Sequence, residues 1–174
     1  AAAESLVLLK NENGVLPLKS PVKLAVFGEH ADSIYPILGD YTSPQRTDEM
    51  LTVFGALKIL SPDAEYTKGW DFFGGTDDFE NALQLAETSD AAVICLGGSS
   101  ARDFSGVYNA KGQAVASKDN FMDCGEGRDV CSLELPGSQL ELLRRLKAIG
   151  KPVISILIQG RTYLLDEVMQ LSDA

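Results

Sequence analysis

The stretch AAVICLGG, residues 91–98, decides the fold class of this chain. Its first six residues are all apolar, and a glycine pair follows them. A continuous apolar run this short is typical of a strand in a parallel sheet that is covered on both faces. The runs KLAVFG at 23–28 and PVISILIQG at 152–160 have the same character, and AEYTKG at 64–69 is a weaker example. We therefore expect strands at residues 23–28, 64–68, 91–96 and 152–158.

Helical patterns alternate with these strands. Apolar residues recur at helical spacing in three segments, and we expect helices at residues 48–60, 78–88 and 138–149. Thr47 is placed to cap the first helix, whereas Ser138 and Glu141 form a capping-box pattern at the start of the last. Regular alternation of strand and helix predicts an α/β fold. The expected architecture is a three-layer α/β/α sandwich around a mainly parallel, flavodoxin-like sheet.

Composition excludes several classes of partner. The 174 residues, 45% of them hydrophobic, are enough for one domain with a core of ordinary size. The net charge of −10, from 15 basic and 25 acidic residues, would repel a phosphate backbone, so we expect no nucleic-acid partner. No apolar run approaches the ~18 to 20 residues of a membrane span, so we expect no membrane partner. Both ends interrupt a pattern, and we expect a partial domain that is truncated on its C-terminal side.

The cysteines and the histidine suggest no metal site. Cys95 lies in an apolar run and is expected to be buried. A disulfide bridge between Cys124 and Cys131 across a loop stays an open alternative. Three cysteines without paired close spacing do not form a zinc pattern. His30, the single histidine, follows the first strand, but no GxSxG motif accompanies it. A packing or hydrogen-bonding histidine is therefore favoured over a general base.

The glycine-rich stretch LGGSSARDF, residues 96–104, resembles a phosphate cradle only superficially. It lacks both the GxGxxG spacing and the lysine of a P-loop, so a nucleotide-binding domain is a distant alternative. Its polar residues are better interpreted as loop anchors or as contacts to a hydroxyl-rich ligand. These residues are Ser99, Ser100, Arg102 and Asp103.

A long irregular segment follows this stretch and contains the most distinctive carboxylic acid. About forty residues separate Gly98 from Ser138, far more than a usual strand-to-helix connection. Within them, Glu126 stands between two glycines in GEGRD. A lone carboxylic acid on a loop suits glycoside hydrolysis, in which one carboxyl group protonates the leaving oxygen while a second attacks. A solvated turn glutamate fits the same residues equally well.

Several longer motifs resemble one known family. AAAESLVLLKNENGVLPL, LGDYTSPQRTDEMLTVFGAL, GGSSARDF, GEGRDVCSLELPGSQLELL and GKPVISILIQGRTYLLDEV occur in the order found in the α/β-sandwich domain of glycoside hydrolase family 3. The resemblance covers nearly the whole chain. It implies that residues 1–174 are a single partial C-terminal domain, and that residues 1–20 are a linker helix and loop leading from a barrel domain.

The same resemblance assigns roles to individual residues. Glu126 matches the general acid/base, and the aspartate nucleophile belongs to the barrel, which is absent from this chain. Arg128 and Asp129 fall near a motif in which an arginine usually follows the aspartate, but here the arginine precedes it. The expected substrate-binding residues are Ser100, Arg102, Asp103, Arg128 and Asp129.

The function implied by the resemblance is that of a retaining β-glycosidase, with a β-glucosidase favoured. The substrate would be an oligosaccharide or an aryl or alkyl β-glycoside, cleaved at its terminal non-reducing β-D-glycosyl residue. No cofactor and no metal are expected. Because the nucleophile would lie in the missing barrel, this chain alone is expected to be inactive. The alternative is a non-catalytic sugar-binding or interaction module on the same fold.

Overall fold

The fold is built on a parallel sheet. A computed structural model of the chain describes residues 2–19, 21–43, 46, 49–72, 78–101, 110, 121–125 and 127–174. In this part of the chain the sheet has four strands in the order β2-β1-β3-β4, and every neighbouring pair is parallel. The strands are β1 (Leu24–Phe27), β2 (Glu65–Thr67), β3 (Ala91–Gly97) and β4 (Val153–Ile158). All four expected strands are confirmed, and each observed end lies within one residue of the expected end.

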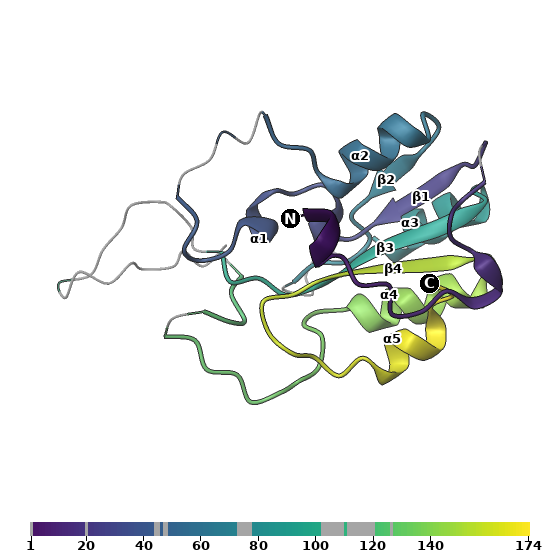
Figure 1. Cartoon of the computed structure of the whole chain (residues 1–174). Coiled ribbons are helices and arrows are strands. Elements are labelled where there is room, and N and C mark those ends of the chain that lie inside the picture. The colour runs from purple at the N-terminus through teal and green to yellow at the C-terminus, as the bar shows by residue number, and fades with distance from the viewer. Residues whose placement is uncertain are drawn as a thin grey trace.

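Helices cover both faces of the sheet, as the three-layer prediction requires (Figure 1). One face packs against α2 (Val53–Leu60) and against apolar residues of the segment that precedes β1. The other face packs against α3 (Phe79–Glu87), α4 (Gln139–Ala148) and α5 (Asp166–Leu171). The strand order is that of the first four strands of a flavodoxin-like sheet.

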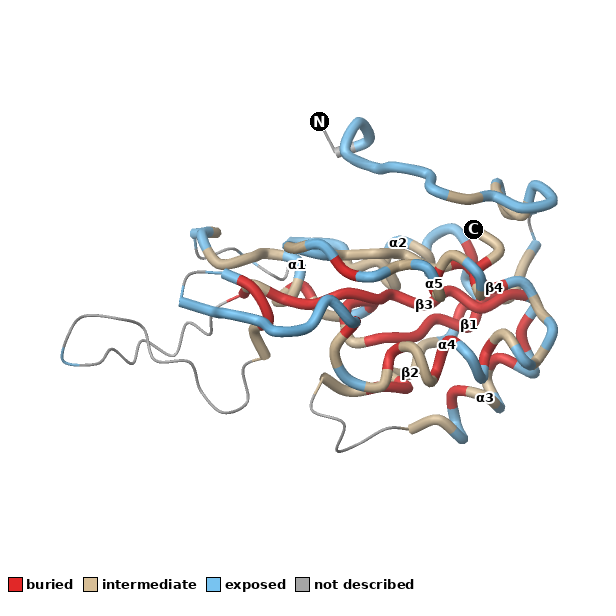
Figure 2. The backbone as a smooth tube through the Cα atoms, turned by 90° about the horizontal axis from the view of Figure 1, so that it is seen from below, coloured by how far each residue is buried: buried red, intermediate tan, exposed pale blue. Residues whose placement is uncertain are grey.

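The two central strands form the core of the domain. Every residue of β1 and β3 is buried (Figure 2), which explains why their sequences are continuously apolar. Successive side chains point to opposite faces, so each strand contributes to two apolar clusters. Phe27 and Ile94 face α3 and α4, whereas Val26 and Val93 face the opposite layer. Cys95 is fully buried, as expected from its place in the apolar run.

Two helix starts differ from the sequence prediction. The helix expected at 48–60 begins at Val53, where the Thr52 hydroxyl accepts a hydrogen bond from the Gly55 N–H at 2.9 Å. Thr47, the predicted cap, lies outside the described residues. At α4, Ser138 makes no side-chain capping bond, and Glu141 pairs instead with Arg145 at 2.8 Å. The predicted capping box is therefore wrong, whereas the helix itself is confirmed.

Shorter helical elements were missed. These are α1 (Tyr35–Leu38), α5 and the 3₁₀ turns at Glu12–Gly14 and Glu29–Ala31. A further 3₁₀ turn at Ala2–Ser5 lies within residues 1–20, where a linker helix and loop were expected. Elements of three to six residues show too little of a helical period to be recognised in a sequence. Among the residues described, no helix has both the length and the apolar character needed to cross a membrane.

The N-terminal segment runs apart from the body of the domain (Figure 2). Four consecutive apolar side chains are largely exposed there: Leu6 at 81%, Val7 at 76%, Leu8 at 65% and Leu9 at 57%. The chain joins the domain just beyond them, where the Lys10 ammonium donates to the carbonyl of Met169 at 2.6 Å. The Glu12 N–H also donates to the carbonyl of Asp173, at 2.8 Å.

Candidate functional site

The candidate site lies at the carboxyl ends of the strands. β1 leads to β2 on one side of the sheet and β3 leads to β4 on the other, so the strand order reverses between β1 and β3. Ligands of open α/β sheets bind outside the carboxyl ends at such a switch point. Here the segment after β1 contributes His30, the segment after β3 contributes Gly98 to Ala101, and the segment after β4 contributes Arg161 and Tyr163.

The glycine pair that ends β3 permits close packing of three segments. A β-carbon on Gly97 would lie 1.7 Å from the carbonyl oxygen of Ile158 in β4. A β-carbon on Gly98 would lie 1.9 Å from the Tyr163 hydroxyl and 2.2 Å from a carboxylate oxygen of Asp123. Protein atoms therefore occupy the space beside these glycines, and the phosphate-cradle interpretation receives no support from this geometry.

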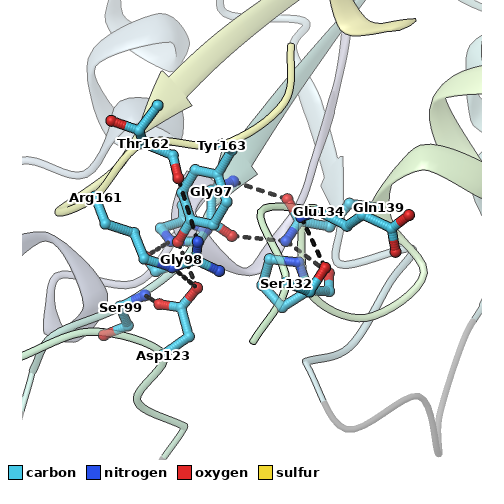
Figure 3. Close-up of polar contacts among 12 residues, drawn as sticks. Gly97, Gly98, Ser99, Asp123, Ser132, Glu134, Gln139, Arg161, Thr162 and Tyr163 are labelled. Carbon is cyan, nitrogen blue, oxygen red and sulfur yellow. Dashed lines mark hydrogen bonds and ion pairs between the residues drawn. The ribbon is translucent and has the colours of Figure 1, made fainter. Parts of the chain in front are cut away.

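Asp123 is the centre of a buried polar cluster that joins these segments (Figure 3). Its carboxylate accepts hydrogen bonds from the Ser99 N–H at 3.0 Å, from Arg161 Nε at 3.2 Å and from the Tyr163 hydroxyl. Its own N–H donates to the carbonyl of Ser99 at 3.0 Å. The residue is 7% exposed. A carboxylate buried to this degree is stable only because it is paired and hydrogen-bonded.

The partners of Asp123 are themselves held in place. The Arg161 guanidinium carbon lies 4.2 Å from the centroid of the Tyr163 ring, as in a cation–π pair. Burial raises the pKa of the Tyr163 hydroxyl, and the hydrogen bond to Asp123 raises it further. Tyr163 therefore remains a protonated donor at neutral pH. The cluster links the end of β3, residue 123 and the segment after β4 into one unit.

The next residues of the chain pack closely against the same edge. Cys124 is 9% exposed, and burial, followed by the charge of Asp123, raises the pKa of its thiol. A β-carbon on Gly125 would lie 3.1 Å from a carboxylate oxygen of Asp40 and 3.6 Å from the β-carbon of Ser100. Cys124 and Cys131 are both free thiols, so the disulfide bridge left open by the sequence is absent.

The structure brings together some of the predicted site residues and not others. Ser100 lies at the edge described above and is half-buried. Arg128 and Asp129 are exposed, and the Arg128 N–H donates to the carbonyl of Gly125 at 3.3 Å. Glu126, Arg102 and Asp103 lie outside the described residues.

The residues that anchor this edge were missed in the sequence. Asp123 stands three positions before Glu126, and Arg161 and Tyr163 follow the last strand in QGRTY. Their positions at a loop stem and just after a strand are the signal that could have identified them. No sequence pattern indicates that they share one carboxylate, because they are brought together only by the pairing of β3 with β4.

His30 has a structural role at this edge rather than that of a free base. Its Nε2 lies 2.7 Å from the carbonyl oxygen of Gly98, and since a carbonyl only accepts, Nε2 carries the proton. Its ring packs edge-on against Phe72, with centroids 5.2 Å apart. The side chain is fully buried, and burial lowers its pKa. The favoured packing and hydrogen-bonding interpretation of His30 agrees with these contacts.

A metal site is not apparent at this edge or elsewhere in the described residues. No group of three or more histidine, cysteine, aspartate or glutamate side chains among them could hold an ion. The Asp123 carboxylate is already shared among three donors of the protein. The arrangement is suited to fixing loops at the carboxyl edge.

Comparison with known proteins identifies the family. The model of the glycosyl hydrolase family 3 C-terminal domain matches residues 6–174. A β-xylosidase of Formosa agariphila is 31% identical over 97% of this chain and 22% of its own length. A periplasmic β-glucosidase of Salmonella typhimurium is 30% identical over 99% of this chain and 23% of its own length. The chain therefore belongs to glycosyl hydrolase family 3, and it corresponds to the C-terminal domain of that family.

Solved structures share the fold of this chain. A β-glucosidase from Erythrobacter marinus superposes with a TM-score of 0.74 and 26% identity, covering 99% of this chain and 24% of that one. A β-glucosidase from Listeria innocua, solved with isofagomine, gives a TM-score of 0.72 at 24% identity, covering 96% of this chain and 20% of that one. The chain thus spans about a quarter or less of these proteins.

Proposed function

We propose that this chain is the acid/base-bearing domain of a retaining β-glycosidase, with a β-glucosidase as the favoured activity. The observation that supports this most directly is the position of residues 123 and 124, the stem of the loop that leads to Glu126. Asp123 and Cys124 are buried against the carboxyl ends of β3 and β4, so the chain enters residue 126 from the edge where α/β sheets hold their ligands. The names of the relatives, β-glucosidase and β-xylosidase, are consistent with this activity.

In this proposal Glu126 protonates the glycosidic oxygen and later deprotonates the attacking water. Ser100, Arg102, Asp103, Arg128 and Asp129 contact the sugar. The aspartate nucleophile is supplied by a barrel domain, to which residues 1–20 connect, and residues 1–174 are one part of the C-terminal domain. The substrate is an oligosaccharide or an aryl or alkyl β-glycoside with a terminal non-reducing β-D-glycosyl residue.

The proposal is tested by Glu126→Ala in the full-length protein. An acid/base mutant should lose activity in proportion to how much help the leaving group needs. We expect a loss of about a hundredfold or more with an alkyl β-glucoside, the scale of general-acid catalysis. A dinitrophenyl β-glucoside, which leaves unaided, should still form the glycosyl-enzyme. Azide, which needs no deprotonation, should then restore turnover and yield a β-glycosyl azide.

The matched control is Glu134→Ala, which removes an exposed glutamate from the same segment. Its backbone N–H contacts the Ser132 hydroxyl at 3.1 Å, and the substitution leaves that contact available. We expect Glu134→Ala to leave the ratio of activity on the alkyl β-glucoside to activity on the dinitrophenyl β-glucoside unchanged. Equal small losses on both substrates for Glu126→Ala, without azide rescue, would contradict the assignment. Sugar binding without any such catalytic pattern would instead indicate a non-catalytic module.

A further inference from the structure

The loop that carries Glu126 is held differently on its two sides. The following side is exposed up to Leu133, whose carbonyl accepts a hydrogen bond from the Leu164 N–H at 2.8 Å, whereas the preceding side is buried much closer to Glu126. On the side that precedes it, Asp123 is 7% exposed and Cys124 is 9% exposed. On the side that follows it, residues 127–134 are all exposed. A β-carbon on Gly127 would meet no other described atom within 4 Å. Both flanking glycines have positive φ, 112° at Gly125 and 71° at Gly127, a conformation that glycine adopts without strain.

The carboxylate of Asp123 makes most of the hydrogen bonds that anchor the preceding side. Asp123 is joined to the segment after β3 by two hydrogen bonds with the Ser99 backbone, both 3.0 Å long. It is joined to the segment after β4 by Arg161 and Tyr163. Figure 3 shows these donors converging on the Asp123 side chain from different segments. The absence of a side chain at Gly98 allows the carboxylate to approach the end of β3.

The position of this carboxylate in the sequence connects it with catalysis. Three residues span at most about 10 to 11 Å of extended chain, so the position of residue 123 limits where residue 126 can lie. General-acid catalysis requires the acid to lie within hydrogen-bonding reach of the leaving oxygen. A misplacement of about 1 Å can cost as much as a hundredfold in rate.

We infer that Asp123 is a positioning residue: with Arg161 and Tyr163 it fixes the stem of the loop and so holds Glu126 over the substrate. This inference rests on the proposed acid/base role of Glu126 and extends it. Asp123 itself does not touch the substrate, since its carboxylate is occupied by protein donors. The exposed Arg128 and Asp129 on the following side do not perform this anchoring.

The test uses Asp123→Asn in the full-length protein. An amide of the same size retains one acceptor oxygen but loses the charge and one acceptor, so the three donors can no longer all be satisfied. We expect kcat/KM for an alkyl β-glucoside to fall about tenfold or more, a misplacement effect. The kcat/KM for a dinitrophenyl β-glucoside should change less than about threefold. The ratio of the two values is measured on one sample, so the fraction of folded enzyme cancels.

Tyr163→Phe provides a milder variant that removes one hydroxyl and keeps the ring under Arg161. We expect kcat/KM for the alkyl β-glucoside to fall again relative to that for the dinitrophenyl β-glucoside. The ratio of the two values should change about threefold, in line with one lost hydrogen bond. If Asp123→Asn does not fold, this variant decides the question alone. An unchanged ratio in every variant that folds would overturn the inference.

Asp173→Asn is the matched control for loss of a structural carboxylate. Asp173 accepts from the Val153 N–H at 2.9 Å and from the Lys147 ammonium at 2.7 Å, at the start of β4 rather than at its carboxyl end. We expect a lower melting temperature and an unchanged ratio. A ratio altered as much as in Asp123→Asn would show that general loosening, not positioning, is responsible. Failure of the proposed function is recognised separately, because Glu126→Ala itself would then lack leaving-group dependence.

Discussion

His30 is a buried titratable side chain at the carboxyl ends of the strands. It is the single histidine of the chain and is fully buried, with Nε2 donating to the carbonyl of Gly98 at 2.7 Å. Burial lowers its pKa, and this effect outweighs the opposing influence of the Gly98 hydrogen bond and of the charges on Glu29 and Asp123. The neutral ring is therefore the form that the fold accommodates.

The lowered pKa predicts that stability declines in mild acid. The unfolded histidine titrates near about 6.5, above its folded value, so the unfolded state binds more protons below that pH. The free energy of unfolding should therefore fall by up to about 1.4 kcal/mol per pH unit from about 6.5 down to the folded pKa of His30, and His30 contributes no further loss below that value. Urea unfolding of the chain at pH 7.5 and 5.5 measures this loss.

His30→Gln is the control for this prediction, because its amide nitrogen can take the place of Nε2 as the donor to the Gly98 carbonyl but does not titrate. The variant should show a smaller difference between the two pH values than the wild-type chain. An identical pH dependence would show that His30 is not the titrating group.

At the scale of single residues, the sequence predicted whether a residue is buried better than it predicted which residues that side chain contacts. Cys95 and His30 could be placed because Cys95 lies within an apolar strand and His30 follows one closely. Asp123 could not, because its three donors come from residues 99, 161 and 163, which only the sheet brings together. The prediction for Glu126 stays a prediction.

Among the elements, α4 is tied to β3 by one buried amide. The Gln139 side chain accepts from the Gly97 N–H at 2.7 Å and donates to the carbonyls of Gly97 at 2.6 Å and Pro136 at 2.8 Å. The side chain is fully buried.

Gln139→Leu should therefore be strongly destabilising. The leucine has a similar size but leaves the backbone groups of Gly97 and the Pro136 carbonyl without their amide partner. The two Gly97 groups are buried, and each buried unsatisfied group costs about 1 to 3 kcal/mol, so we expect a loss of about 2 to 6 kcal/mol in the free energy of unfolding. The exposed Gln84→Leu on α3 should change it by less than about 0.5 kcal/mol. Equal effects of the two substitutions in urea unfolding would refute the interpretation of Gln139.

The elements that the sequence predicted are those with a strong local pattern. The strands are continuous apolar runs, and α3 and α4 show clear helical spacing. The start of α2 was predicted wrongly because it depends on a tertiary contact. The Thr52 hydroxyl that caps the helix also donates to the Asp32 carboxylate at 2.8 Å, twenty residues earlier in the chain. No local pattern distinguishes this cap from Thr47.

For the molecule as a whole, the parallel sheet and both helical layers follow from the alternation of strands and helices. What the alternation does not reveal is the surface that remains uncovered. Leu6 and Val7, at 81% and 76% exposure, belong to the apolar N-terminal run. Their sequence resembles a buried segment, and only the structure shows that the described part of this chain does not cover it.

The proposed division of catalytic groups predicts that the 174-residue chain alone is inactive. A retaining glycosidase needs two carboxyl groups about 5 Å apart, one as acid/base and one as nucleophile. In the proposal only Glu126 comes from this chain, so a proton can be donated but no glycosyl-enzyme can form. We expect no hydrolysis of a p-nitrophenyl β-glucoside above buffer controls, whereas an equimolar amount of the full-length protein hydrolyses it.

This comparison is meaningful only if the separate chain is folded, which circular dichroism and a cooperative urea transition would establish. Folded chain without activity supports a nucleophile in the missing domain. Hydrolysis by the pure chain that is abolished by Glu126→Ala would show that both carboxyl groups reside within these 174 residues. The nucleophile would then have to be sought among the other carboxylates of this chain, beginning with Glu29, which follows β1 and pairs with Lys68 at the same edge of the sheet.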